Sequence, residues 1–188
     1  MTGVNKLLAM AVFVGAVLVP ASARADGFVI PWVGGNAGSH NASGVIDVGA
    51  TVGVTAASVI DVDVDLGYSP DFFGNGLNSY VLTTMGNLTV GIPFGGTRAP
   101  RFRPYLTGGV GLIRARIEDT RFGYTVGHND LGISFGGGMT AFIANHVGVR
   151  ADLRYMRSLE DDTSTNLFTQ FDLGPLHYWR TSIGLVLR

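Results

Sequence analysis

The chain of 188 residues contains no cysteine. This absence excludes a disulfide framework and a thiolate metal site. Charged residues make up only 14% of the sequence, and after Lys6 every cation is an arginine. Because no strongly basic segment is present, we expect no nucleic-acid partner.

The patterns of helical proteins are also missing. After residue 25, no stretch repeats apolar residues at a 3.6-residue period, and none approaches 18 consecutive apolar residues. Transmembrane helices are therefore excluded from this part of the chain. What is abundant is apolar side chains, at 46%, and glycine, with 28 residues. This composition is too apolar for a disordered chain and too rich in glycine for a typical helical one, which favours β-structure or a membrane.

The N-terminal segment has the pattern of a secretory signal peptide. An apolar run of 13 residues, Leu7 to Val19, follows a lysine and is too short to span a bilayer as a helix. Small residues follow in two motifs that suit cleavage, one ending at Ala23 and the other at Ala25. We predict that residues 1–25 are the signal peptide and that residues 26–188 form one exported domain with 11 basic and 14 acidic side chains.

In this domain, apolar and polar residues alternate with the two-residue period of β-strands. The alternation assigns a clear apolar face to most of the strands, whereas the first and fifth are apolar or glycine-rich on both faces and stay unoriented. The predicted strands are 28–36, 45–56, 58–69, 79–92, 102–117, 129–142, 146–158 and 177–188.

The predicted connections alternate in length along the chain. Those after the second and sixth strands are very short, that after the fourth is intermediate, and those after the odd-numbered strands are longer and polar. An even number of strands with short turns at one end and long loops at the other is typical of outer-membrane barrels. We therefore predict an all-β fold, an eight-stranded antiparallel up-and-down transmembrane β-barrel with both termini on the periplasmic side.

Alternation alone does not decide which face is outside, since a soluble lipocalin-like barrel would have its apolar face inside. Three observations favour apolar residues outside: small polar residues suit a narrow lumen, charges in the middle of strands oppose long apolar faces, and aromatic residues lie near strand ends. The chain also offers no helix that would cover so much apolar surface. The predicted aromatic girdle comprises Trp32, Tyr68, Tyr80, Phe94, Phe102, Tyr155 and Trp179.

The stretch VIDVDVDLGY places three aspartates on one face of the third strand. The polar faces of the seventh and eighth strands carry arginines and one aspartate, and strands three and seven lie across an eight-stranded barrel from one another. We predict a charge network inside the lumen that fixes strand register, with a gate or selectivity filter of a narrow pore as the functional alternative. Its members are Asp61, Asp63, Asp65, Arg150, Asp152, Arg154 and Arg180.

Metal and catalytic sites are not predicted. The aspartates partly match a calcium loop, but the glycine falls one position late, at Gly67, and Phe72 stands where a bidentate glutamate is needed. No histidine forms a His-x-Ser spacing on an apolar strand face, which a lipid-deacylating barrel would use. We therefore expect no metal, no cofactor and no enzymatic activity. The four histidines, in loops or near strand ends, are His40, His128, His146 and His177.

Residues 26–188 resemble the small outer-membrane β-barrel proteins related to the OmpA transmembrane domain and to OmpX. The resemblance rests on the signal peptide, the eight strands, and the stretches DVDLGYSPDFFG and RPYLTGGVGLIRARI, which are similar to this family's third strand with its loop and to its fifth strand. It implies a monomer in the outer membrane of a Gram-negative cell. Its expected partners are outer-membrane lipid, lipopolysaccharide and, during biogenesis, the barrel assembly machinery.

Three functions stay open at this point. The first is a structural role in the envelope or passive passage of very small solutes through a narrow, charge-lined lumen. The second is a surface adhesin or ligand-binding barrel that acts through long extracellular loops, and the third is a soluble lipocalin-like periplasmic carrier. In the loop SPDFFGNGLN, we expect Phe72 and Phe73 to anchor in the lipopolysaccharide interface.

Overall fold

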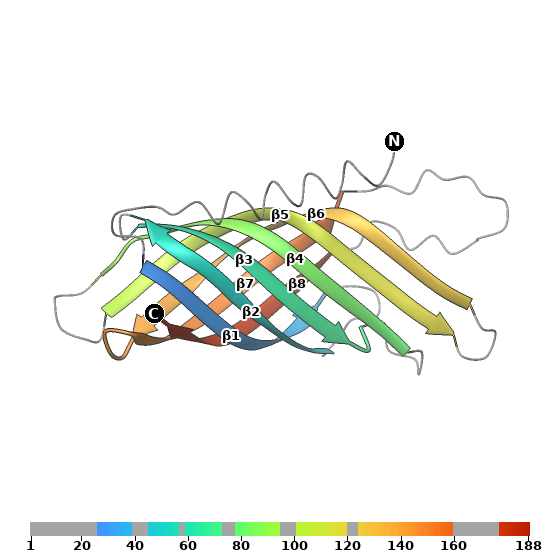
Figure 1. The fold of residues 1–188 in the computed structure, drawn as a ribbon, viewed down its shortest axis with the longest axis horizontal. Coiled ribbons are helices and arrows are strands. Elements are labelled where there is room, and N and C mark those ends of the chain that lie inside the picture. The colour runs from blue at the N-terminus through green and yellow to red at the C-terminus, as the bar shows by residue number, and fades with distance from the viewer. Residues whose placement is uncertain are drawn as a thin grey trace.

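A computed structural model describes residues 26–38, 45–56, 59–72, 78–94, 101–119, 124–159 and 177–188, so the predicted signal peptide lies outside the described residues. Eight antiparallel strands close into one barrel in the order of the sequence (Figure 1). They are β1 (Asp26–Ala37), β2 (Val45–Ala56), β3 (Ile60–Pro70), β4 (Asn78–Gly91), β5 (Arg101–Asp119), β6 (Tyr124–Phe142), β7 (Val147–Ser158) and β8 (His177–Leu187). The predicted fold class is confirmed.

Each strand pairs with its two neighbours, and β1 pairs with β8 to close the sheet. Both termini of the barrel and the connections after β2, β4 and β6 lie at one end, which we call the turn end, and the other four connections lie at the loop end. One predicted loop is shorter than expected. Because β5 ends at Asp119 and β6 begins at Tyr124, only residues 120–123 connect these two strands.

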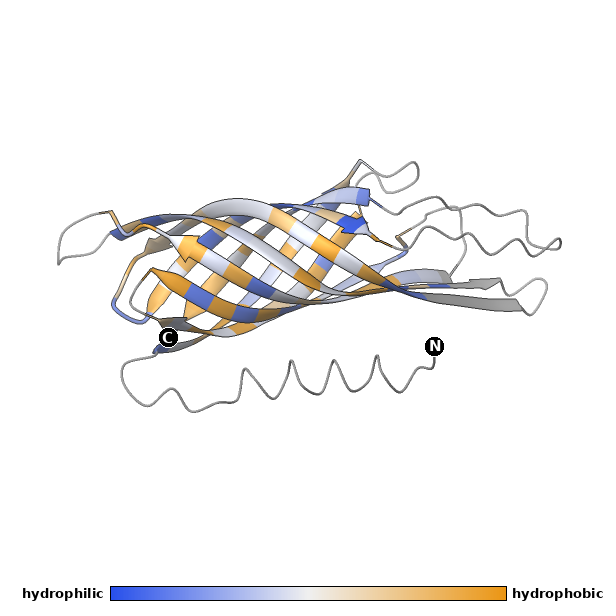
Figure 2. Ribbon diagram, turned by 90° about the horizontal axis from the view of Figure 1, so that it is seen from above, coloured by the Kyte–Doolittle hydropathy of each residue, from blue (hydrophilic) through white to orange (hydrophobic). Residues whose placement is uncertain are grey.

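The strands present apolar side chains outside and polar side chains inside. In β3, Leu66 is 48% exposed, whereas its neighbour Asp65 is 1% exposed. Figure 2 shows the same alternation of apolar and polar residues along the strands. The structure also orients the two strands that alternation left open, because Ile30 of β1 and Tyr105 of β5 point inward and are buried. Among the described residues, no helix has the length and apolarity needed to cross a bilayer.

Six residues of the predicted girdle lie on the outer face: Tyr68, Tyr80, Phe94, Phe102, Tyr155 and Trp179. The prediction for Trp32 is wrong, since this residue points into the barrel and is 8% exposed. The first strand is apolar on both faces, so its period could not reveal this orientation. Inside, the Trp32 indole N–H donates a hydrogen bond to Asp65, which satisfies its one polar group.

Phe72 also differs from its expected position in the outer interface. It is fully buried at the loop end of the barrel, where it follows Asp71, a residue with the positive φ of 54°. The Asp71 amide donates to the Ser79 carbonyl at 2.7 Å, which fixes this turn and directs Phe72 over the interior. Phe73 lies outside the described residues.

Glycines make room for the largest side chains of the interior. A Cβ at Gly49 would overlap the Trp32 ring, and one at Gly138 would overlap the Tyr105 hydroxyl and the Ala151 carbonyl. An eight-stranded barrel is only wide enough to be filled by side chains, so a bulky residue on one strand needs a small one opposite or beside it. The glycine content seen in the sequence thus follows in part from aromatic residues inside the barrel.

Replacing Leu153 by arginine tests the apolar outer face. Leu153 lies near the middle of β7 and is 45% exposed, so the charge would meet the hydrocarbon core and should reduce the free energy of unfolding by about 2–4 kcal/mol. The matched control is Ile143→Arg in the turn after β6, where the expected cost is at most about 1 kcal/mol. Denaturant titration of both variants in lipid bilayers measures the difference, and equal costs would contradict the orientation.

Candidate functional site

Asp65 of β3 lies at the centre of the polar contacts inside the barrel. Its Oδ1 accepts a hydrogen bond from Arg180 Nη2 of β8 at 2.6 Å. Its Oδ2 accepts hydrogen bonds from Thr51 of β2 at 2.8 Å and from the Trp32 indole of β1 at 3.1 Å, while Arg154 Nη1 of β7 lies 4.0 Å away. One carboxylate therefore connects side chains from five strands.

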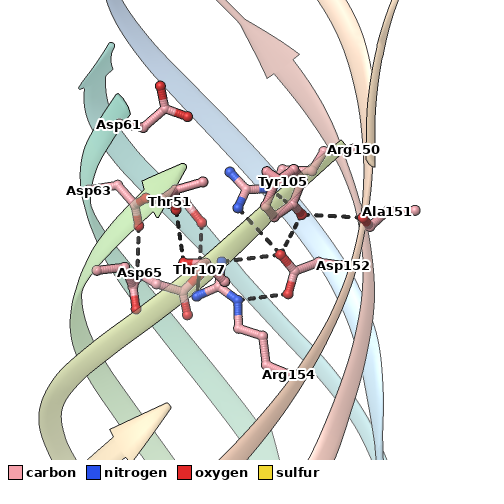
Figure 3. A network of polar contacts seen from close by, with 12 residues as sticks. Thr51, Asp61, Asp63, Asp65, Tyr105, Thr107, Arg150, Ala151, Asp152 and Arg154 are labelled. Atoms are coloured by element: carbon pink, nitrogen blue, oxygen red, sulfur yellow. Dashed lines mark hydrogen bonds and ion pairs between the residues drawn. The ribbon is translucent and has the colours of Figure 1, made fainter. Parts of the chain in front are cut away.

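A second centre is Asp152 on β7 (Figure 3). Its Oδ1 accepts from Arg154 Nε at 2.7 Å, and its Oδ2 accepts from Arg150 Nη2 at 3.3 Å and from the Tyr105 hydroxyl of β5. Arg150 Nε donates to the Tyr105 oxygen at 2.7 Å, and the Arg150 guanidinium lies 4.1 Å from the centre of the Tyr105 ring. Two positive charges thus surround one carboxylate, and one of them, Arg150, also contacts Tyr105 across the lumen.

Asp63 lies between these groups but is held by neutral donors. The Asn87 amide donates to it at 2.7 Å and the Thr89 hydroxyl at 3.4 Å. Among the described residues it forms no ion pair. The hydroxyl oxygens of Thr89 and Thr107 lie 2.8 Å apart, within hydrogen-bond distance, so the contacts of Asp63 extend from β3 through β4 to β5.

Asp61 forms an ion pair that the sequence analysis did not predict. Arg103 of β5 binds it through two nitrogen atoms, at 2.7 and 3.1 Å. Arg103 and Tyr105 were missed because their strand is rich in glycine and apolar residues on both faces. The signal was available in the spacing, since Arg103, Tyr105 and Thr107 share one face.

Two apolar layers bracket the contacts of Asp65 and Asp152. One lies at the loop end, where the Phe72 and Tyr178 rings meet edge to face with centres 5.2 Å apart, and the other lies at the turn end. Both clusters are buried, so the contacts of Asp65 and Asp152 are separated from both ends of the barrel by apolar side chains. The pair of Asp61 and Arg103 lies nearer the turn end, because the register places Asp61 level with the start of β1. The loop-end layer consists of Phe72, Val81, Met85, Ile113, Met156 and Tyr178, and the turn-end layer of Phe28, Ile30, Phe142 and Val186.

The structure places all seven predicted network residues inside the barrel, each between 0% and 9% exposed. Their arrangement differs in detail from two facing ladders. Asp152 pairs mainly with the arginines of its own strand, and Arg180 rather than Arg154 makes the shortest contact with Asp65. Asp61 joins Arg103 in a separate pair nearer the turn end.

Arginines also gather at the turn end, where β5 begins and β8 ends. The Arg188 guanidinium lies 4.5 Å from the centre of the Phe142 ring, and that of Arg101 lies 5.8 Å from the same ring. Burial, followed by the positive charges of Arg103 and Arg101, lowers the pKa of the Arg188 guanidinium. This end of the barrel therefore concentrates positive charge around one aromatic residue.

The histidines do not form a site in the part of the chain that the structure describes. His146 is exposed in the turn after β6, and His177 is exposed at the start of β8. His40 lies outside the described residues, and for His128 only the backbone is placed, in β6. Within the described ranges, no three His, Asp or Glu side chains are grouped to hold a metal ion.

Replacing Asp152 by asparagine should strongly destabilise the barrel. The change leaves Arg150 and Arg154 buried without their carboxylate, which costs about 3–5 kcal/mol of unfolding free energy. The matched control is Asp63→Asn. Asp63 accepts only from the neutral side chains of Asn87 and Thr89, so the unfolding free energy should fall by less than about 1.5 kcal/mol. Denaturant titration in one lipid or detergent compares the two, and a larger cost for Asp63→Asn would refute this ranking.

Comparisons with known proteins agree with this geometry. The family described as outer membrane protein beta-barrel domain matches residues 9–173. The structure is similar to Neisserial surface protein A, with a TM-score of 0.66 and 14% identity over 87% of this chain and 98% of that chain. It is also similar to the N-terminal β-barrel domain of Pseudomonas aeruginosa OprF, with a TM-score of 0.57 and 11% identity over 86% and 95% of the two chains.

A third similar structure is Ail, the attachment invasion locus protein of Yersinia pestis, with a TM-score of 0.51 and 11% identity over 87% of this chain and 98% of that chain. At such identities the likeness extends to the fold alone. No curated protein sequence matches the chain. Because the family match covers most of the sequence and the barrel closes with eight strands, the chain belongs to the outer-membrane β-barrel protein family and resides in the outer membrane.

Proposed function

We propose that this protein is a structural barrel of the outer membrane with a closed interior and no enzymatic activity. The observation that carries the proposal is the pair of apolar layers that bracket the ion pairs of Asp65 and Asp152. Passage of a solute would require both the apolar layers and the charged contacts to move. The closed interior thus favours the structural role over the passage of small solutes.

The charged contacts support this role because they tie distant strands together. Arg180 and Asp65 are 115 residues apart in the sequence, and Arg103 and Asp61 are 42 apart. Breaking a buried pair by removing one partner typically costs about 3–5 kcal/mol. The pairs therefore hold the wall in one register, and thermal motion would separate them only rarely.

The outer face supports the expected lipid partners. Aromatic residues near the strand ends suit the two membrane interfaces, and the band between them is apolar. Tyr68 and Tyr80 lie side by side toward the loop end, with ring centres 5.8 Å apart, and Tyr155 and Trp179 form a second pair at 5.2 Å. We propose that these pairs contact lipopolysaccharide, that the protein inserts through the barrel assembly machinery, and that it acts as a monomer.

A second candidate function is surface attachment through the loop end. The observation that favours it is the length of β5 and β6, which have 19 residues each. Pairing of β6 with β7 begins only at Gly132, so residues 124–131 extend beyond the end of β7 (Figure 1). Such a projecting hairpin offers a surface for a partner outside the cell, independent of the interior. The similar protein Ail is named for attachment and invasion.

Conductance across a planar lipid bilayer tests the closed interior. The full barrel should show no resolved openings, because apolar layers lie on both sides of the charges. Electrophoresis of unboiled and boiled samples of the same preparation should show the compact folded form, which establishes that folded barrel was added to the bilayer.

Two variants of one strand make this test specific. Arg154 is buried in the network, whereas Arg157 is exposed on the same strand. If the unmodified protein conducts, and Arg154→Gln but not Arg157→Gln alters the openings, the interior controls a pore and the structural proposal fails.

A further inference from the structure

The described interior contains a cavity of about 10 Å³ next to Asp65. It lies near the middle of the charged region, between the two apolar layers. A cavity of this size accommodates one water molecule and no larger ligand. The side chains and backbone that matter for its chemistry belong to Ile30, Trp32, Asp65, Arg154, Ser182 and Gly184.

One buried donor at this cavity has no protein partner. Arg154 Nη1 forms no hydrogen bond, although the Arg154 side chain is only 2% exposed. Its nearest carboxylate oxygen, Asp65 Oδ2, is 4.0 Å away, too far for a direct hydrogen bond. A separation beyond 3.5 Å between two buried polar groups is where a bridging water is expected. The hydroxyl-bearing residue Ser182 lines the same space from β8.

The charges around the cavity limit the chemistry of its ligand. Two arginines and two aspartates line it, so the surroundings favour a neutral molecule. The ligand must accept a hydrogen bond from Arg154 and donate one to Asp65. Chloride cannot donate and ammonium cannot accept, whereas water does both.

We propose that this cavity binds a single water molecule. The water accepts a hydrogen bond from Arg154 Nη1 and donates one to Asp65 Oδ2, and the Ser182 hydroxyl is its third partner. Three such contacts are the usual number for a buried water. The water thus bridges Asp65 Oδ2 of β3 and Arg154 Nη1 of β7, which are 4.0 Å apart and form no direct hydrogen bond. This inference concerns the interior alone and does not depend on the structural role proposed above.

The wall beside the cavity is interrupted. Pairing between β1 and β8 joins Val29 to Leu187 and resumes at Trp32 and Gly184, so Ile30 and Pro31 have no partner on β8. Proline has no backbone N–H to donate to the ladder. A Cβ atom added to Gly184 would lie 2.9 Å from the Pro31 carbonyl oxygen, so this carbonyl faces β8. The nitrogen and the carbonyl of one residue in an antiparallel strand point to the same side, so the nitrogen of Pro31, which has no hydrogen, also faces β8.

This interruption gives the bound water a route of exchange. The two apolar layers close the ends of the barrel, whereas Ile30 and Gly184 belong both to the interrupted seam and to the cavity wall. Separation of β1 and β8 at Pro31 breaks one backbone hydrogen bond fewer than separation at another position along these strands. Because the outer side of the seam faces hydrocarbon, exchange of the water with solvent requires the seam to open as far as the turn end, past the single pair of Val29 and Leu187.

The water is detected by nuclear Overhauser transfer from water to the Trp32 indole proton in the full barrel folded in detergent. This proton is a suitable probe because Trp32 donates to Asp65 Oδ2, the same oxygen that the water would bind. A direct cross peak is expected for the unmodified protein. It should be lost in Ser182→Val, which fills the cavity, and kept in Thr181→Val, on the exposed outer face next to it.

Absence of the cross peak in the unmodified protein overturns the site, whether or not the variants fold. Persistence of the cross peak in a folded Ser182→Val variant overturns it as well.

The exchange route has its own test, deuterium exchange of the Trp32 indole proton. Pro31→Ala restores one donor and should slow this exchange about fivefold, whereas Pro104→Ala in β5, where pairing with Met139 is continuous, should leave it unchanged. Equal rates in Pro31→Ala and the unmodified protein overturn the route.

Discussion

The carboxylate of Asp65 is the contact on which the rest of the interior depends. It binds Arg180, Thr51 and Trp32 directly and lies near Arg154, so it joins β3 to strands on both sides of the closing seam. A carboxylate in this position is tolerable only if donors surround it, because burial of an unpaired charge is costly. The strands must therefore stand in one register for the donors to reach it.

The membrane imposes the complementary constraint from outside. A shift of β3 or β7 by one residue would turn its inward aspartates or arginines toward lipid and its leucine and valine residues toward the charges. Polar contacts inside and hydrocarbon outside thus select the same register. The apolar layers add to this, since Phe72 packs on the loop-end side and Phe142 on the turn-end side of the contacts of Asp65 and Asp152.

Much of this arrangement could be predicted from the sequence where the two faces of a strand differ in polarity. In β3 and β7 the alternation was clear, and the charged residues predicted to face the lumen lie inside. In β1 both faces are apolar or glycine-rich, so the inward position of Trp32 could not be deduced from the period. In β5 the apolar and glycine-rich residues obscured the shared face of Arg103, Tyr105 and Thr107, so Arg103 was missed as the partner of Asp61. Phe72 was misplaced for another reason, because its position depends on the backbone turn at Asp71.

The most direct test of the account is the coupling between Asp65 and Arg180 in unfolding free energy. It is measured by a double-mutant cycle with Asp65→Asn, Arg180→Met and the combined variant in one lipid composition. If the cross-lumen pair holds β3 and β8 together, the coupling should be about 1.5–3 kcal/mol. Effects of the two substitutions that add within about 0.5 kcal/mol would show that the pair does not hold the barrel closed.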